Sequence, residues 1–481
     1  MSFGSRPAAW IATAIMAATV CYSVFRIPIQ MTDSLIPLLD AQRTPSVVAA
    51  FANGASNAGY FRPLRAAQIQ AVYELANGHY FAAFKTYQAA FVVLVFALFV
   101  TAVEVDSPER LAALLFALTV LTGLHTFRGT VWEAYPVNHS LEVAAFCVLA
   151  LVLARSKAGR WTDTAAALTF LAAAFTVESG LLVWVVIAVA WLTGARGISR
   201  RGVLIVTALL AGYFAMRFVY LHTGVPALSE RSSGFGLRQL GPDELQRRFG
   251  GRPYVFYAYN AMSSLLTVLF SEPRAGIWTI PVEYLRGRIA AGTVINVVSS
   301  VVTTAVIAWF LTRRLHAWRT RQFDRDDQLM IVALVVLAAN ALISFSYTKD
   351  EIMGPGGVFY AIAAFVAVAH VLRGRKQVAS SKGQSSEGGG ARSAAVALTM
   401  ALFIAASGWV VRTAGLHYQM HLMGFYDRNE WVYVDDWLAR QKSAPASAEG
   451  RALVQQLRSD AIERRTINPY LLSPRLDQWF R

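Results

Sequence analysis

Side chains with a potential for chemistry fall in four short polar stretches of an otherwise apolar chain. The first stretch is QMTDSLIPLLD (Gln30–Asp40), in which Asp33 and Asp40 stand about two helical turns apart. A carboxylate at this position can serve as a general base for a hydroxyl within hydrogen-bond reach. Asp33 followed by Ser34 is also a common way to cap a helix. Asp40 has an ordinary interfacial role within LIPLLDAQ.

The other three polar stretches carry both acidic and basic groups. They are HTFRGTVWEAYPVNH (His125–His139), TVESG (Thr176–Gly180) and SYTKDEIMGPGG (Ser346–Gly357). Cationic side chains suit a phosphate, whereas carboxylates suit a hydroxyl or a divalent metal. Capping of the helix that follows is a sufficient alternative explanation for the TVESG carboxylate. The candidate residues in these stretches are Arg128, Glu133, His139, Glu178, Lys349 and Asp350.

The composition identifies the class of protein that must position these groups. Hydrophobic residues make up 56% of the 481 residues and charged residues only 15%. A soluble domain of this size cannot bury so much apolar surface, so the chain is a polytopic membrane protein. Most Lys and Arg residues behind the net charge of +15 lie in short loops, which argues against nucleic acid as a partner. Cys21 and Cys147 lie in apolar segments and form neither a disulfide framework nor a metal cluster.

Hydropathy predicts an all-α fold with eleven membrane spans. A twelfth apolar run, Val255–Phe270, is ambiguous. Arg217, near the end of one span, is expected to snorkel to the interface. The eleven spans are expected at about 8–25, 83–103, 111–127, 140–154, 164–177, 179–194, 202–221, 291–312, 328–346, 356–372 and 394–413.

Basic loops predict the orientation of these spans. Cytoplasmic loops of membrane proteins carry an excess of Lys and Arg. If Val255–Phe270 crossed the membrane, the basic loop RRLHAWRTR (Arg313–Arg321) would lie outside. We therefore expect this run to remain on the outer side, with the N-terminus inside and the C-terminal tail outside. The four basic loops are RSKAGR (Arg155–Arg160), GARGISRR (Gly194–Arg201), RRLHAWRTR (Arg313–Arg321) and RGRKQ (Arg373–Gln377).

The predicted organisation is one membrane domain over residues 1–415 and a small outer tail over residues 416–481. Within the domain, a first outer loop covers about 26–82, a second outer segment about 222–290, and a cytoplasmic linker about 374–393. The first loop is expected to hold interfacial helices. One of these helices repeats apolar residues at helical spacing, namely Leu64, Ala67, Ile69, Val72 and Leu75.

The layout resembles the GT-C superfamily of integral membrane glycosyltransferases. The resemblance is greatest to the bacterial branch that includes lipid A aminoarabinose transferases and protein mannosyltransferase-like enzymes. It rests on the early Asp33, on YFRPL (Tyr60–Leu64) and on TFRGTVWEAYPVNH, and it covers roughly residues 1–415. It implies transfer of a sugar from a polyprenyl-phosphate donor to a lipid, glycan or protein acceptor. The site would lie on the outer face of the bacterial inner membrane.

The resemblance also implies roles for individual residues. Asp33 would be the general base of a single inverting displacement. Many members of the superfamily carry a second acidic residue beside the first, where this chain has Ser34, and Glu133 could supply that carboxylate. A divalent metal, Mg²⁺ or Mn²⁺, is left open as a cofactor of Asp33 and Glu133. Lys349 is expected to bind the lipid phosphate, with Arg62 or Arg128 as alternates. The remaining substrate-binding candidates are His139, Glu178 and Asp350.

Three other functions remain open at this level. An O-antigen ligase or polymerase shares the layout but uses diphosphate-linked glycans and outer-loop arginines. A transporter or flippase would also place charges in a helix bundle, but no inverted repeat is evident. A non-catalytic envelope-assembly protein is the third alternative. The arginines that keep the ligase alternative open are Arg231, Arg238, Arg247, Arg248 and Arg252.

Overall fold

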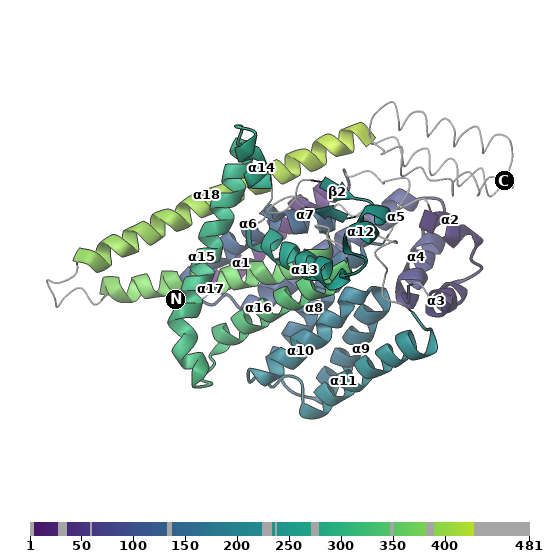
Figure 1. The fold of residues 1–481 in the computed structure, drawn as a ribbon. Coiled ribbons are helices and arrows are strands. Elements are labelled where there is room, and N and C mark those ends of the chain that lie inside the picture. Colours follow the sequence, from purple (N-terminus) through teal and green to yellow (C-terminus); the bar gives the residue numbers. More distant parts are fainter. Residues whose placement is uncertain are drawn as a thin grey trace.

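The chain is helical almost throughout the part that the structure describes (Figure 1). This structure is a computed structural model, and its only strands in the described part are β1 (Ser233–Phe235) and β2 (Arg238–Leu240), which pair antiparallel. The predicted all-α membrane architecture is therefore confirmed at the level of a helical chain with apolar spans. The described residues are 4–26, 36–57, 60–131, 137–223, 233–235, 238–270, 279–346, 351–380 and 389–427.

Seven helices in these ranges are long and apolar enough to cross a membrane by length and composition. A helix rises about 1.5 Å per residue, so about 20 residues cover a hydrocarbon core of about 30 Å. The seven are α1 (Ser5–Val24), α5 (Tyr80–Val103), α11 (Arg200–Phe214) with the π-helical turn η3 (Ala215–Tyr220), α15 (Ala291–Arg319), α16 (Arg325–Ile343), α17 (Gly354–Ser380) and α18 (Gly389–Asp427).

Four shorter apolar helices pack among the long ones. The expected span at 111–127 ends early, because Leu124 adopts an extended backbone conformation and α7 (His125–Val131) starts as a separate short helix. The four are α6 (Pro108–Gly123), α8 (His139–Arg155), α9 (Arg160–Thr176) and α10 (Leu182–Leu192), the last preceded by the 3₁₀ turn η2 (Glu178–Leu181).

Three short helices, α2 (Ile36–Arg43), α3 (Val47–Ser56) and α4 (Pro63–Ala76), follow α1 and lie together at one end of the bundle (Figure 1). Proline at the first position of α4 and the left-handed Asn77 at its end fix the length of this helix. Its buried face agrees with the predicted one at Ala67, Ile69 and Val72 but departs from it near the end of the helix. Leu75 is 82% exposed, whereas Gln70 and Tyr73 are buried. The Gln70 side chain is buried because it donates to the carbonyl of Thr44, just after α2.

The segment between η3 and α15 holds α12 (Pro242–Phe249), α13 (Pro253–Phe270) and α14 (Thr279–Leu285). Asn260 of α13 donates to the carbonyl of Phe345, which lies in η6 (Ser344–Ser346) after α16. Near the C-terminal end of α13, the carbonyl of Leu269 accepts a hydrogen bond from Thr304. Thr304 also bonds the hydroxyl of Tyr360, close to the start of α17. Helix α13 therefore contacts η6 through its middle and α15 through its C-terminal end.

The predicted linker and loop boundaries shift because several basic stretches are helical. Helix α15 continues through the expected loop to Arg319, and α17 continues to Ser380. These stretches are rich in Arg, Lys and Gln, which favour helix. Helix α18 begins at Gly389, inside the predicted linker of 374–393, and ends at Asp427, inside the predicted tail of 416–481. Residues 381–388 and 428–481 lie outside the described part.

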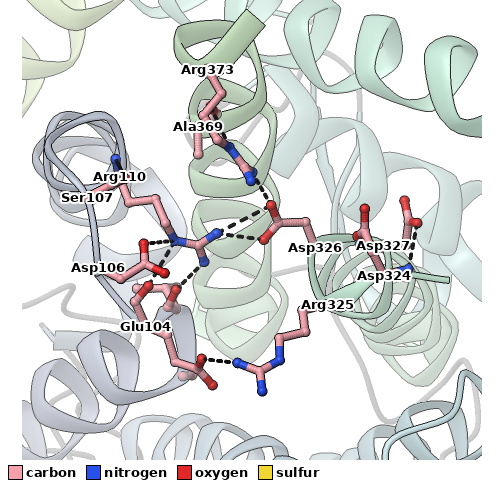
Figure 2. A network of polar contacts seen from close by, with 12 residues as sticks. Glu104, Asp106, Ser107, Arg110, Asp324, Arg325, Asp326, Asp327, Ala369 and Arg373 are labelled. Atoms are coloured by element: carbon pink, nitrogen blue, oxygen red, sulfur yellow. Dashed lines mark hydrogen bonds and ion pairs between the residues drawn. The ribbon is translucent and has the colours of Figure 1, made fainter.

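Ion pairs join the loops at one end of the bundle, which we call the basic end (Figure 2). Asp326, in the first turn of α16, pairs with Arg110 of α6 at 2.9 Å and with Arg373 of α17. Glu104, after α5, pairs with Arg155 at 3.3 Å and with Arg325 at 3.0 Å. Connections distant in sequence are therefore held in one network.

Two further contacts bring the remaining basic stretches to the basic end. The amide of Gly197 donates to the carbonyl of Ala154 over 2.9 Å, which joins the α10–α11 loop to the end of α8. Arg314 of α15 pairs with Asp327 of α16 at 2.5 Å. All four basic stretches and the loop EVDSPER (Glu104–Arg110) thus meet at the same end.

Candidate functional site

The most distinctive charged cluster away from the basic end is built on the start of α4. Phe61 is buried and packs edge-on against Phe175 and Tyr213, with ring centroids 5.5 and 5.7 Å away. This anchor fixes Arg62, the residue before the proline that opens α4. The Arg62 guanidinium lies over the ring of Tyr60 at 4.7 Å. The contacts of Tyr60 and Phe61 therefore hold the Arg62 side chain against the neighbouring helices.

Glu178 forms an ion pair with Arg62. The chain reverses between α9 and α10 within η2, and Gly180 makes the reversal feasible because a Cβ there would lie 2.0 Å from the carbonyl oxygen of Ala173. Oε2 of Glu178 lies 2.6 Å from Nη2 of Arg62. Burial alone would raise the pKa of Glu178, but the guanidiniums of Arg62 and Arg217 hold that pKa below its usual range. Glu178 is therefore a carboxylate in this site.

Arg217 is the second cation on the same carboxylate. Its Nη2 lies 3.2 Å from Oε1 of Glu178, and its Nη1 donates to the hydroxyl of Tyr213 over 2.9 Å. Arg217 lies in the π-helical turn η3, a widened turn of a kind often found at functional sites. The expected snorkelling of Arg217 is wrong, because its side chain is buried and directed at Glu178.

The resulting Arg62–Glu178–Arg217 cluster carries two positive charges and one negative charge. Nε of Arg62 and Nε of Arg217 are both buried without a hydrogen-bond partner among the described residues. The side chains of Arg62 and Glu178 are 22% and 25% exposed, so the cluster reaches the surface. A net positive pair of guanidiniums with spare N–H donors suits a phosphate group.

A buried carboxylate lies further along α4. Glu142, in the first turn of α8, is 0% exposed, and its Oε2 accepts a hydrogen bond of 2.9 Å from Gln68 of α4. The hydroxyl-bearing ring of Tyr87 on α5 lies beside it. An acidic side chain buried near a membrane is costly and tends to mark function. The same helix, α4, thus covers both Glu178 and Glu142.

A buried lysine on α5 is linked to the end of α7. Lys85 of α5 is 4% exposed, and its Nζ lies 3.4 Å from Oε1 of Gln88. Gln88 in turn donates to the carbonyl of Val131, the last residue of α7, over 2.6 Å. Lys85 is therefore a buried basic group linked through Gln88 to the end of α7.

The side chain of Asn138 joins α7 to the start of α8. Asn138 caps α8 by accepting from the amide of Leu141, and its Nδ2 donates to the carbonyl of Thr130. Gly354 opens α17 against Thr130, and a Cβ there would lie 2.1 Å from the threonine Oγ1. The first turn of α17, in GPGG, is therefore packed directly on α7.

The structure brings together some of the predicted site residues. Arg62 and Glu178 form an ion pair. His139 is buried in the first turn of α8, three residues before Glu142. Arg128 lies on α7, with its side chain outside the described part. The other predicted residues, Asp33, Glu133, Lys349 and Asp350, also lie outside the described residues.

Three residues of the site, Lys85, Glu142 and Gln68, were missed by sequence reasoning, and Arg217 was assigned to the interface instead. Lys85 and Glu142 carried a signal, because each interrupts an apolar run that was assigned as a span. Gln68 carried none beyond its polarity, since its partner Glu142 is distant in sequence. Within the described ranges, no three His, Cys, Asp or Glu residues lie close enough to hold a metal ion.

Comparison of the chain with models of protein families, with curated protein sequences and with solved structures finds no match.

Proposed function

We propose that the chain is an integral membrane glycosyltransferase that uses a polyprenyl-phosphate sugar on the outer face of the bacterial inner membrane. In this proposal the seven long helices and the four shorter ones, α6, α8, α9 and α10, make eleven spans. The helices α2 to α4 lie in the outer interface. Helix α13 is taken not to cross, because the chain then keeps all four basic stretches on the same side of the membrane.

The orientation in this proposal follows from the basic end. Lys and Arg in short loops favour the cytoplasm. Helix α9 runs from Arg160, near the basic end, to Thr176, beside Glu178, a rise of about 25 Å. Helix α8 rises about 20 Å from Glu142 to Arg155. The Arg62–Glu178–Arg217 cluster and Glu142 would therefore face the outside.

The observation that carries the proposal is the Arg62–Glu178–Arg217 cluster under the start of α4. A sugar linked to a polyprenyl phosphate leaves behind a stabilised anion, so transfer needs cations for the phosphate and one base for the acceptor. The acceptor oxygen attacks the anomeric carbon, and the bond from that carbon to the phosphate oxygen breaks with its electron pair. Asp33 takes the acceptor proton. Single displacement inverts the anomeric centre.

The remaining predicted roles belong to the same proposal. Lys349 and Asp350 would bind the donor beside the arginines, and Arg128 and His139 would border the site. Mg²⁺ or Mn²⁺, if used, would be held by Asp33 and Glu133.

The ligase alternative loses support from α12. Arg247 and Arg248 both pair with Glu244 on the same exposed helix, within one turn. Both arginines are engaged locally and show no convergence with the charged groups under α4. The geometry of the described residues therefore favours the polyprenyl-phosphate transferase.

Substitution of Asp33 tests the proposal, with Asp40→Asn as the matched control. Asp40 is exposed on α2, seven residues along the same stretch. Membranes with each variant are incubated with labelled polyprenyl-phosphate hexoses and pentoses, and label leaving the donor lipid is measured. We expect transfer by the wild type and by Asp40→Asn, and none by Asp33→Asn at equal membrane content. Full transfer by Asp33→Asn removes the proposed base, and no transfer by the wild type refutes the function.

A further inference from the structure

Glu178 holds the two arginines of the cluster in a bridging arrangement. Its Oε2 pairs with Arg62 and its Oε1 with Arg217. Each guanidinium is also held from another side, Arg62 by stacking on Tyr60 and Arg217 by the hydroxyl of Tyr213. Removal of the carboxylate would therefore leave both arginines in place. The two would then present adjacent donors to any other anion.

The charges of the cluster match the two states of a phosphate that loses a substituent. With Glu178 ionised and in place, the cluster has a net charge of +1, which balances a phosphodiester. A phosphomonoester carries about −1.5 to −2 at pH 7, because its second pKa is about 6. Displacement of Glu178 from the guanidiniums exposes a charge of +2, which balances that product. The buried Nε donors of Arg62 and Arg217 supply further contacts.

We propose that Glu178 is an exchangeable counter-ion that occupies the place of a lipid phosphomonoester and gives up the two arginines to it. The identity of that lipid as the leaving polyprenyl phosphate rests on the proposed function. Before the lipid arrives, Glu178 stops the two guanidiniums from repelling each other. As negative charge develops on the leaving phosphate, the phosphate oxygens replace the carboxylate oxygens on Arg62 and Arg217. No covalent bond to the protein is formed.

The surroundings of Arg217 favour a lipid as the source of the phosphate. While Arg217 is directed inward, its neighbours on the π-helical turn are exposed large apolar residues. Phe218 is 44% exposed and Val219 70% exposed. On α11, Leu204 is 59% exposed and continues the same type of surface toward the basic end. A phosphate on the arginines can therefore have its hydrocarbon chain along α11 in the bilayer.

Binding of a polyprenyl monophosphate to the full chain in phosphatidylcholine nanodiscs tests this inference. The variants are Glu178→Gln and, as a matched control, Glu244→Gln. Glu244 is also a carboxylate between two arginines, but on exposed α12. We expect Glu178→Gln to bind the monophosphate about tenfold more tightly than the wild type, because two charge-assisted contacts no longer have to be broken. Glu244→Gln should bind as the wild type does.

Equal or weaker binding by Glu178→Gln overturns the inference, since a carboxylate that contacts substrate or only braces the fold would not compete with phosphate. Should Glu178→Gln fail to yield a monodisperse protein, Glu178→Asp gives the same test. Its shorter side chain releases one guanidinium, so a smaller gain in affinity is expected and a loss refutes the inference.

Two further arms identify the source of the phosphate. Inorganic phosphate replaces the lipid in one arm, and phosphatidylglycerol is added to the nanodisc as a competitor in the other. We expect the gain in Glu178→Gln to be confined to the polyprenyl monophosphate. An equal gain for inorganic phosphate, or full competition by phosphatidylglycerol, would overturn the assignment to the polyprenyl lipid. The binding assay contains no sugar, so it is independent of transfer activity. Tighter binding by Glu178→Gln together with a wild type that transfers no sugar would sustain the inference and refute the proposed function. Transfer by the wild type without tighter binding by Glu178→Gln would sustain the proposed function and refute the inference.

Discussion

Replacement of Asp326 at the basic end is expected to be costly. It is 7% exposed, and Arg110 approaches both of its oxygens, at 2.9 and 3.3 Å. Arg373 pairs with it from α17. Asp106 offers a matched comparison on the same guanidinium, because its carboxylate is 65% exposed and lies 3.8 Å from Arg110 (Figure 2).

The expected loss of stability depends on the partners that Arg110 and Arg373 keep when the Asp326 carboxylate is removed. Removal of one partner of a buried ion pair costs about 3–5 kcal/mol when the other charge stays uncompensated. Arg110 still donates to the carbonyls of Val103 and Glu104, and Arg373 is 44% exposed to solvent. We therefore expect Asp326→Asn to lower the free energy of unfolding by about 2–3 kcal/mol. Asp106→Asn should cost about 0–1 kcal/mol, as exposed pairs do.

Unfolding of the purified chain by dodecyl sulfate in mixed micelles measures both variants against the wild type. The midpoint and slope of each transition give the difference in unfolding free energy. If Asp326→Asn and Asp106→Asn differ by less than about 0.5 kcal/mol, the buried pair adds nothing beyond an exposed one. The view that this network fixes the basic end would then be refuted.

Three further predictions concern topology, packing and pH. Reporter fusions at Gly234 and Arg319 should report outside and inside respectively, and the opposite pattern would overturn the eleven-span proposal. Gly180→Ala should destabilise the fold by about 1–3 kcal/mol, because its Cβ would overlap a carbonyl of α9, whereas Gly212→Ala on α11 has open space and should be neutral or better in thermal unfolding. The pKa of Glu178 is lowered in the folded state, so the stability that the wild type has over Glu178→Gln should be complete above about pH 4.5 and should vanish as the pH falls through the folded-state pKa. A difference in thermal midpoint that grows on acidification would contradict the assignment of its partners.

Hydropathy and charge patterning predicted much of the fold. Each of the eleven apolar runs corresponds to a helix, and the four basic stretches meet at one end, because burial and charge are properties that short windows of sequence report. The end of α6 at Gly123 was not predicted, although a glycine followed by the polar residues His125 and Thr126 is a common pattern at a helix end. The helical continuation of α15 and α17 was also missed, because polar helix and polar loop have similar compositions.

The candidate site was less predictable than the fold. Glu178 was singled out as the carboxylate of the TVESG turn and Arg62 through the family resemblance of YFRPL, but their pairing across 116 residues is a property of the packed bundle. Arg217 was assigned to the interface because sequence alone does not reveal a π-helical turn. That turn redirects its side chain from the lipid toward Glu178. The number of guanidiniums on the carboxylate, and hence the net charge of the cluster, became known only with the structure.

The separation of the cluster along the chain has a consequence for biosynthesis. Arg62 is made 116 residues before its partner Glu178, which at ribosomal rates of about 5–20 residues per second is a delay of about 6–23 s. During that time α4 has no carboxylate to hold its first turn, although α1 and α5 are already available for insertion. The start of α4 therefore cannot form its ion pair with Glu178 until α9 has been inserted. Docking of the start of α4 thus follows the synthesis of α9 and Glu178.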